Sequence, residues 1–223
     1  MLVFVAIYTS IKVKNIAVLY YLLTAIVVGI CIYKIKKDGI DEKRVPIAGL
    51  VAAGIFAAQM LNWPIPGGTS AHFVGGAVAA IILGPFLGCI AMVSVVSIQA
   101  LVFGDGGITA LGTNLFSMAI VGVFVAYYIY KALNKYNTKI AAFVAGWIGI
   151  TLGAINTGIA TGLSSTFQYA ITTTVPIMGI WHGILGIIEG LITVAIIAYI
   201  EKNREDILYI SNKTKNKSRS GKK

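Results

Sequence analysis

Two glycine-rich polar segments interrupt the long apolar runs of this sequence and hold side chains capable of chemistry. Together they supply groups that can form hydrogen bonds or ligate an ion: imidazole in the first, carboxylate in the second, and amide and hydroxyl in both. We expect any functional site to be built by these two breaks. The segments are residues 62–73, N-W-P-I-P-G-G-T-S-A-H-F, and residues 103–114, F-G-D-G-G-I-T-A-L-G-T-N, and the side chains of interest are Asn62, Ser70, His72 and Asp105.

The composition places these breaks in a membrane protein. The chain has 223 residues, of which 57% are hydrophobic and 12% charged, and its mean hydropathy is +0.86. Several apolar runs have the ~20-residue length that spans a hydrocarbon core of ~30 Å. The net charge of +10 lies in short loops and the tail, where the positive-inside rule accounts for it, so nucleic-acid binding is not expected. Cys31 and Cys89 lie in apolar runs without C-x-x-C spacing, which favours a packing role.

The apolar runs and their breaks predict an all-α membrane protein with about seven transmembrane helices. All five prolines are expected at the ends of helices, and the third helix is short for a membrane span. Residues 1–15 are expected to belong to the mature protein, because their charges follow the apolar run instead of preceding it. The predicted helices are 16–33, 46–61, 69–83, 86–103, 109–130, 140–160 and 176–200.

The basic residues predict the orientation of these helices. Three segments hold 16 of the 18 Lys and Arg residues: 34–44, 131–139 and the chain from 201 onward. With seven helices and the N-terminus outside, all three segments face the cytoplasm. Residues 1–200 therefore form a transmembrane domain, and residues 201–223 form a basic cytoplasmic tail able to lie at an anionic lipid surface.

This topology gathers the polar breaks at the outer end of the bundle, together with a second histidine. His182 lies about two turns into the last helix, and Glu189 follows seven residues later on roughly the same face. A carboxyl group inside a membrane is costly and usually functional, so Glu189 either clamps two helices together or lies near a metal ion. Four neighbouring glycines predict a close helix-packing surface: Gly179, Gly183, Gly186 and Gly190.

Long stretches of the chain resemble a known transporter family. They are I-F-A-A-Q-M-L-N-W-P-I-P-G-G-T-S-A-H-F-V-G-G, L-G-P, Q-A-L-V-F-G-D-G-G-I-T-A-L-G-T-N-L-F-S-M-A and G-I-W-H-G-I-L-G-I-I-E-G-L-I-T. In these stretches, which cover most of residues 45–201, the sequence is similar to the CbiM/NikM family. Those proteins are the substrate-binding membrane subunits of energy-coupling factor (ECF) transporters for cobalt and nickel.

The resemblance implies a seven-helix subunit whose outward pocket captures divalent cobalt or nickel as the transported substrate, with no catalytic cofactor. In the family the N-terminal amine, a histidine at position 2 and the histidine of G-G-T-S-x-H ligate the ion. Carried over to this sequence, the ligands are Met1 and His72. Other residues are expected to support a ligand or to take its place: His182, Asp105, Asn62, Ser70 and Glu189.

The sequence departs from the family at its start. Position 2 is Leu2, and the opening M-L-V-F-V-A-I-Y lacks the M-H-I-P-D-G type of pattern. Two protein nitrogens alone do not hold nickel or cobalt selectively against water. Three explanations stay open: the native protein starts differently, the metal is held by a set that recruits His182 or Asp105, or metal binding has been lost.

The chain is not expected to be an enzyme. It lacks the G-x-x-x-x-G-K-[ST] phosphate loop that binds ATP in many ATPases. The resemblance implies that paired cytoplasmic ATPase subunits hydrolyse ATP, and that a transmembrane coupling subunit and a small accessory membrane subunit are further partners. The expected location is the cell membrane. The alternatives are a stand-alone ion-coupled carrier or channel, and an intramembrane hydrolase using Ser70 or Ser97, which the absence of a G-x-S-x-G turn disfavours.

Overall fold

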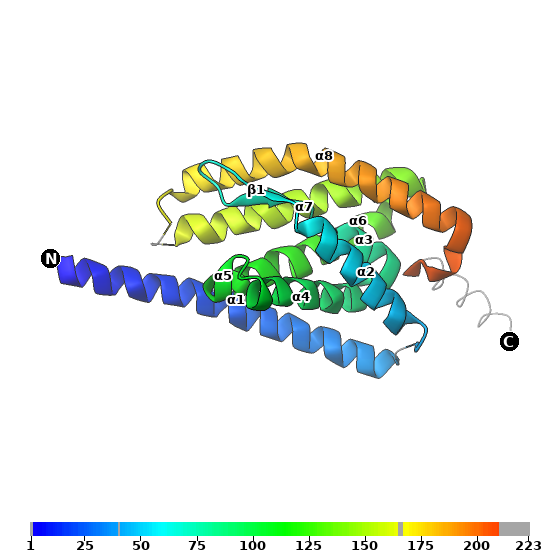
Figure 1. Cartoon of the computed structure of the whole chain (residues 1–223), viewed down its shortest axis with the longest axis horizontal. Coiled ribbons are helices and arrows are strands. Elements are labelled where there is room, and N and C mark those ends of the chain that lie inside the picture. Colours follow the sequence, from blue (N-terminus) through cyan, green and yellow to red (C-terminus); the bar gives the residue numbers. More distant parts are fainter. Residues whose placement is uncertain (1, 40, 165–166, 210–223) are drawn as a thin grey trace.

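Helices dominate the structure, a computed structural model that describes residues 2–39, 41–164 and 167–209 (Figure 1). In chain order the helices are α1 (Leu2–Asp38), α2 (Arg44–Gln59), α3 (Gly76–Leu83), α4 (Pro85–Val102), α5 (Gly107–Asn114), α6 (Val123–Leu133), α7 (Thr138–Leu163) and α8 (Ile171–Arg204). Between α2 and α3, the strands β1 (Asn62–Pro64) and β2 (Ser70–His72) form a hairpin. A π-helix, η1 (Leu115–Gly122), joins α5 to α6, and a 3-10 turn, η2 (Glu205–Ile207), follows α8.

Five helical stretches are long and apolar enough to cross a membrane. They are 16–38 in α1, α4, the continuous run from α5 through η1 to α6, α7, and α8 continued through η2. At 1.5 Å per residue, α2 and α3 are too short for a full span. If the continuous run from α5 through η1 to α6 is counted as one, the helical segments within the described ranges number seven, as the sequence predicts. The protein is a multi-pass membrane protein.

The third predicted helix, 69–83, is wrong in its first half. Only α3 is helical there, and residues 70–72 pair with residues 62–64 in antiparallel register. The reason is local: Gly67 and Gly75 both have positive φ, near +75°, which a helix does not accommodate. The hairpin is closed by Gly68 N donating to Ile65 O at 3.0 Å. The prolines at 64 and 66 keep this segment out of a helix as well.

The first and last helices extend beyond their predicted bounds. α1 runs from Leu2 to Asp38 and its N-terminal part projects past the bundle, because lysines near both ends are good helix formers and do not end a helix (Figure 1). α8 begins at Ile171, so Pro176 lies inside the helix, not at its start as predicted. The first turn forms before the proline, where Thr173 N and Thr174 N both donate to Ala170 O. α8 also passes residue 200 without a break.

The most extensive packing between two helices joins α7 to α8, which run side by side (Figure 1). A Cβ at Gly190 would lie 2.8 Å from Phe143 O, and one at Gly186 would lie 2.9 Å from Trp147 O. The predicted packing surface is therefore confirmed at these two glycines. Gly183 has open space instead. Cys31 in α1 and Cys89 in α4 are fully buried in the core.

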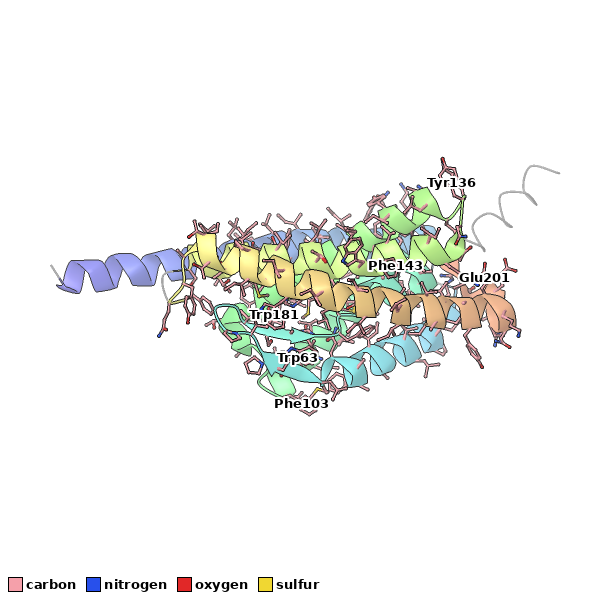
Figure 2. All side chains as sticks on the ribbon, turned by 90° about the horizontal axis from the view of Figure 1, so that it is seen from above. Trp63, Phe103, Tyr136, Phe143, Trp181 and Glu201 are labelled. Carbon is pink, nitrogen blue, oxygen red and sulfur yellow. The ribbon has the colours of Figure 1, made fainter. Side chains whose placement is uncertain are left out.

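The two ends of the bundle differ in character. Tyr136, in the basic α6–α7 connection, and Glu201 near the end of α8 lie toward one end, whereas Trp63 of the hairpin and Phe103 lie farther toward the other (Figure 2). The basic connection between α1 and α2 lies at the same end as the end of α8 (Figure 1). The fold thus separates the basic segments from the hairpin.

Candidate metal-binding pocket

His72 is the last residue of β2 and stands opposite Asn62 of β1. Its Nδ1 lies 2.8 Å from the carbonyl oxygen of Phe73. Because a carbonyl oxygen only accepts hydrogen bonds, Nδ1 must carry the hydrogen in this arrangement. The lone pair is therefore left on Nε2, the form in which a histidine binds a metal while a backbone carbonyl orients its ring.

His182 has the same arrangement in a different setting. It lies within α8, and its Nδ1 is 3.0 Å from the carbonyl oxygen of Met178, one turn earlier. Nε2 is again the nitrogen with the lone pair. The side chain is buried, with 4% of its surface exposed. Two imidazoles, one on α8 and one on the strand that follows the hairpin turn, thus have Nε2 atoms that make no hydrogen bond within the described residues.

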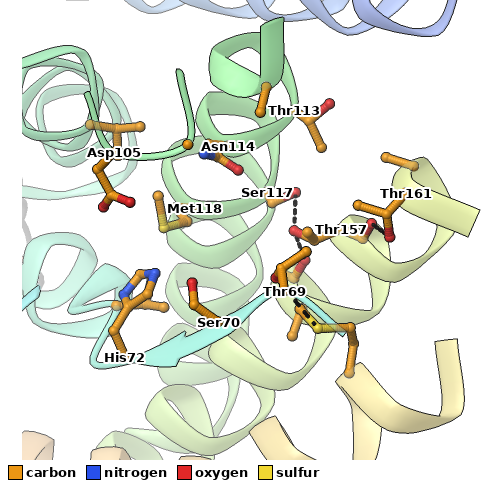
Figure 3. A pocket seen from close by; sticks show the side chains of 18 of the residues that line it. Thr69, Ser70, His72, Asp105, Thr113, Asn114, Ser117, Met118, Thr157 and Thr161 are labelled. Carbon is orange, nitrogen blue, oxygen red and sulfur yellow. Dashed lines mark hydrogen bonds between the residues drawn. The ribbon is translucent and has the colours of Figure 1, made fainter. Parts of the chain in front are cut away.

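One cavity of about 420 Å³ is lined by both histidines, and Figure 3 shows it from close by with His72 labelled. Its walls come from α1, the hairpin, α4, α5 with η1, α7 and α8. The side chains of Asp105 and Ser70 also line it, and Figure 3 shows both turned to the space beside the His72 ring. Asp105 is solvent-exposed, so it lies at the mouth of the cavity. Thr69 reaches across the cavity to α8, where its hydroxyl lies 3.6 Å from Met178 Sδ.

Hydroxyl and amide groups form the opposite wall. The Ser117 hydroxyl accepts from Asn156 Nδ2 at 2.9 Å and from Thr157 Oγ1 at 3.0 Å. Asn156 Oδ1 in turn accepts from the hydroxyl of Tyr20 in α1. Ser117 belongs to the π-helix η1, a distortion often found at functional sites. This network ties α1, η1 and α7 together at the base of the cavity.

Gln99 adds a donor without a partner. Its side chain is 3% exposed, it lines the cavity from α4, and its Nε2 makes no hydrogen bond in the described part of the chain. A buried donor left in this state favours an acceptor arriving with a ligand or with water. The cavity therefore has bonding capacity that its own residues do not use.

The structure brings together some of the predicted residues and not others. His72, His182, Asp105 and Ser70 line the cavity. Asn62 is exposed on β1, and the Glu189 carboxylate accepts from backbone amides behind β2, so neither contributes to the described lining. Met1 lies outside the described residues. Sequence reasoning missed several lining residues: Gln99, Thr113, Ser117, Met118, Thr157, Thr161 and Met178. For the polar ones, the only signal was a polar position within an apolar run.

Imidazole nitrogens suit a transition metal such as nickel or cobalt, whereas a site of carboxylates alone suits calcium or magnesium. The described residues contain no group of three or more His, Cys, Asp or Glu side chains placed to hold a metal. The cavity is also far larger than a bare ion and has the size of a small-molecule pocket. It therefore has room for water or further chain to complete the coordination of an ion bound at the two imidazoles.

Comparisons with known proteins agree with this architecture. A solved structure described as a truncated transition metal transporter matches 84% of this chain and 94% of its own, with a TM-score of 0.81 and 34% identity. A relative from Archaeoglobus fulgidus that bears the name of a fused nickel transport protein, NikMN, is 55% identical over 87% of this chain. The chain spans only 64% of that relative's length.

A relative from Thermosipho melanesiensis, the cobalt transport protein CbiM, is 33% identical over 86% of this chain and 85% of its own length. A family model described as the cobalt uptake substrate-specific transmembrane region matches residues 13–207, which include both breaks and both histidines of the pocket. On this match and on its likeness to these relatives, the chain belongs to the CbiM family.

Proposed function

We propose that this protein is the membrane subunit that captures divalent cobalt or nickel for an ATP-driven importer of the ECF type. The observation that carries the proposal is the shared cavity of His72 and His182, whose free Nε2 atoms come from two elements far apart in sequence. Neutral imidazoles are the ligands that such ions favour. The names of the relatives support cobalt or nickel as the cargo.

The cavity is proposed to open to the outside of the cell. The basic connections and the end of α8 lie away from the hairpin, and basic loops stay in the cytoplasm by the positive-inside rule. That places Asp105 and the hairpin at the outer surface, with the N-terminus outside. Metal then enters past Asp105, whose carboxylate attracts a cation, and reaches the two imidazoles.

The remaining ligands are proposed to come from beyond the described residues or from solvent. Met1 is the expected amine ligand, and Asp105 is the described carboxylate closest to the mouth of the cavity. With Leu2 in place of the family's histidine, His182 is the residue of this chain able to supply a second imidazole. Water fills the rest of the coordination sphere.

The energy for import is proposed to come from separate subunits. The chain lacks a phosphate-binding loop, and the described residues form a helical membrane domain. A transmembrane coupling subunit and paired cytoplasmic ATPases would drive the release of the ion inward. The Archaeoglobus relative carries further chain beyond the matched part, which fits an additional membrane component in these systems.

Uptake into liposomes tests the proposal. The full chain, reconstituted with its coupling and ATPase subunits, is expected to import radioactive nickel or cobalt only with ATP, and His72→Ala is expected to abolish the import. Ser94→Ala is the control, because that hydroxyl bonds only within α4, to Ile90 O. Uptake by this chain alone would instead indicate a stand-alone carrier, and absence of bound metal in equilibrium dialysis would indicate that binding has been lost.

Cysteine labelling tests the orientation. The two native cysteines are fully buried, so single added cysteines give a clean signal. In intact cells a membrane-impermeant maleimide is expected to label Asp105→Cys, and to label Tyr136→Cys only after the membrane is permeabilised. The reverse pattern would overturn the outward placement of the cavity.

A further inference from the structure

Glu189 is the only acidic residue deep inside a described membrane-spanning helix, and within the described residues its carboxylate forms no ion pair. It is 2% exposed. Its two oxygens accept separate hydrogen bonds, from Val74 N at 2.9 Å and from Gly75 N at 3.0 Å. Burial of a carboxylate in a membrane is costly, so this arrangement calls for a function.

The two amides form a small anion-binding turn. Gly75 has φ +75°, which turns successive N–H groups of Val74 and Gly75 toward the same side. Gly75 is also the N-cap residue of α3, and as a glycine it offers that helix no side-chain cap. Glu189 therefore supplies, from α8, the negative charge favoured at the N-terminus of a helix.

A second side chain bonds to Val74, at its carbonyl oxygen. Gln59, at the end of α2, donates from Nε2 to Val74 O at 2.6 Å. The amide and the carbonyl of Val74 are thus each bonded to a side chain, one from α8 and one from α2. Val74 lies two residues after His72, and the intervening Phe73 provides the carbonyl that orients the His72 ring.

We infer that Glu189, assisted by Gln59, is the positioning residue that sets the His72 imidazole in the cavity. Besides the packing of its buried Ile65 and Ala71, the hairpin that bears His72 has few other side-chain bonds to the bundle: in the described contacts, Thr69 reaches Met178 only through a long hydroxyl–sulfur contact. The Glu189 carboxylate therefore acts on the ligand through the backbone of Val74 and Phe73 and makes no contact with the ion itself.

This arrangement also links the ligand to the outer faces of the bundle. On the side away from the cavity, Glu189 lies at the base of an apolar groove between α2 and α8, which includes Gly54 and Ile188. Through Val74, the segment that follows His72 is thus bonded to both helices that flank this groove.

The role of Glu189 in metal binding depends on the proposed function, but the position of the His72 ring can be tested without metal. The chain has only two histidines, so ¹⁵N-histidine labelling of the metal-free full-length protein in nanodiscs gives two sets of imidazole signals, each from one Nδ1 and one Nε2. Glu189→Gln cannot accept at both oxygens, so one amide loses its partner. The His72 signals are expected to shift or broaden, while those of His182 stay close to their wild-type positions.

Glu201→Gln is the matched control, since Glu201 is an exposed glutamate on the same helix. It is expected to move neither imidazole signal. Unchanged His72 signals in Glu189→Gln would overturn the inference, as would an equal change from Glu201→Gln. If Glu189→Gln does not fold, Gln59→Met removes the other anchor and is expected to shift the same His72 signals. Unchanged signals in that variant overturn the inference as well.

Nickel affinity gives the second readout. Loss of a group that orients a ligand typically costs 10–100-fold in metal affinity, so Glu189→Gln is expected to weaken nickel binding by about that factor. In a His72→Ala background the same change is expected to cost less than about threefold, because the path through His72 is already lost. An equal cost in both backgrounds contradicts the positioning role. A wild-type chain that binds no nickel contradicts the proposed function instead, and the imidazole spectra then still decide the role of Glu189.

Discussion

The two histidines of the cavity are held there by different means. His182 belongs to a regular helix, and its place follows from the packing of α8 on α7 through Gly186 and Gly190. His72 ends a short strand, and the segment after it is fixed by side chains of α2 and α8. The position of one histidine therefore depends on close backbone contact, and that of the other depends on a few polar bonds.

The difference predicts opposite sensitivities. Added volume between α7 and α8 should displace His182, because backbone atoms there leave no room for a side chain. Loss of a single polar group should displace His72, because no continuous packing of a long helix replaces the lost bond. The following substitutions test this contrast, from the largest expected effect to the smallest.

The largest effect is expected from the two proposed ligands. His72→Ala should weaken nickel binding at least ~100-fold, and His182→Ala by about tenfold, since His72 is the proposed main ligand and His182 the proposed supporting one. Isothermal titration of the purified protein in detergent measures both. A larger loss in His182→Ala would reverse the assignment of the main ligand.

Volume added between α7 and α8 should lower stability. A Cβ in Gly190→Ala would come within 2.8 Å of Phe143 O, so we expect a loss of about 1–3 kcal/mol in the free energy of unfolding. Gly183→Ala is the matched control on the same helix, where the new methyl group has open space and the change should stay within about 0.5 kcal/mol. Denaturant titration in mixed micelles compares them. Equal losses would mean that close contact does not fix α8.

Removal of the Gln59 amide should affect binding more than stability. Gln59→Met keeps the volume but loses the donor to Val74 O, a bond of about 1 kcal/mol, so nickel affinity should fall roughly fivefold. Stability should change little, because Gln59 Oε1 is already buried with no partner in the part of the chain that the structure describes. Titration calorimetry and thermal unfolding on one preparation separate the two effects. A stability loss without an affinity loss would contradict the contrast.

The smallest effect is expected at the base of the cavity. Thr157→Val removes the bond to the Ser117 hydroxyl, and hydrogen bonds between membrane helices average about 0.6 kcal/mol. Nickel affinity should stay unchanged, because neither histidine is bonded to this network. Denaturant titration against Ser94→Ala, whose hydroxyl bonds only within its own helix, provides the comparison. A several-fold loss of nickel affinity would place Thr157 closer to the ion than the structure does.

Much of the helical architecture could be predicted from hydrophobic length. Runs of about 20 apolar residues become helices in a membrane because each backbone polar group must be satisfied within its own segment. The same rule failed at residues 69–75. Gly67 and Gly75, which have positive φ, and the prolines at 64 and 66 outweigh the apolar composition there. The early start of α8 was missed because Pro176 suggested that the helix begins at the proline. The helix begins earlier, with a threonine-rich first turn.

The site was predictable only in part. His72, His182 and Asp105 stood out because ionisable residues are rare in this chain, and the structure places all three around one cavity. Ser117, Thr157 and Gln99 gave no comparable signal, since small polar residues are common in membrane helices. Glu189 was recognised as costly, but its sequence position was compatible with either a metal ion or a clamp between helices; in the structure its carboxylate accepts from the backbone amides of Val74 and Gly75, just before α3.

By itself, the sequence determined that this chain is a multi-pass helical protein and which residues could hold a cation, because hydrophobicity and residue type are local properties. Only the tertiary structure decided which of those residues line one cavity. His72 and His182 are separated by more than a hundred residues, and their place around the cavity depends on the α7–α8 contact and on the bonds from Glu189 and Gln59 to Val74. Such contacts between distant segments arise from packing and hydrogen-bond geometry, which no local pattern specifies.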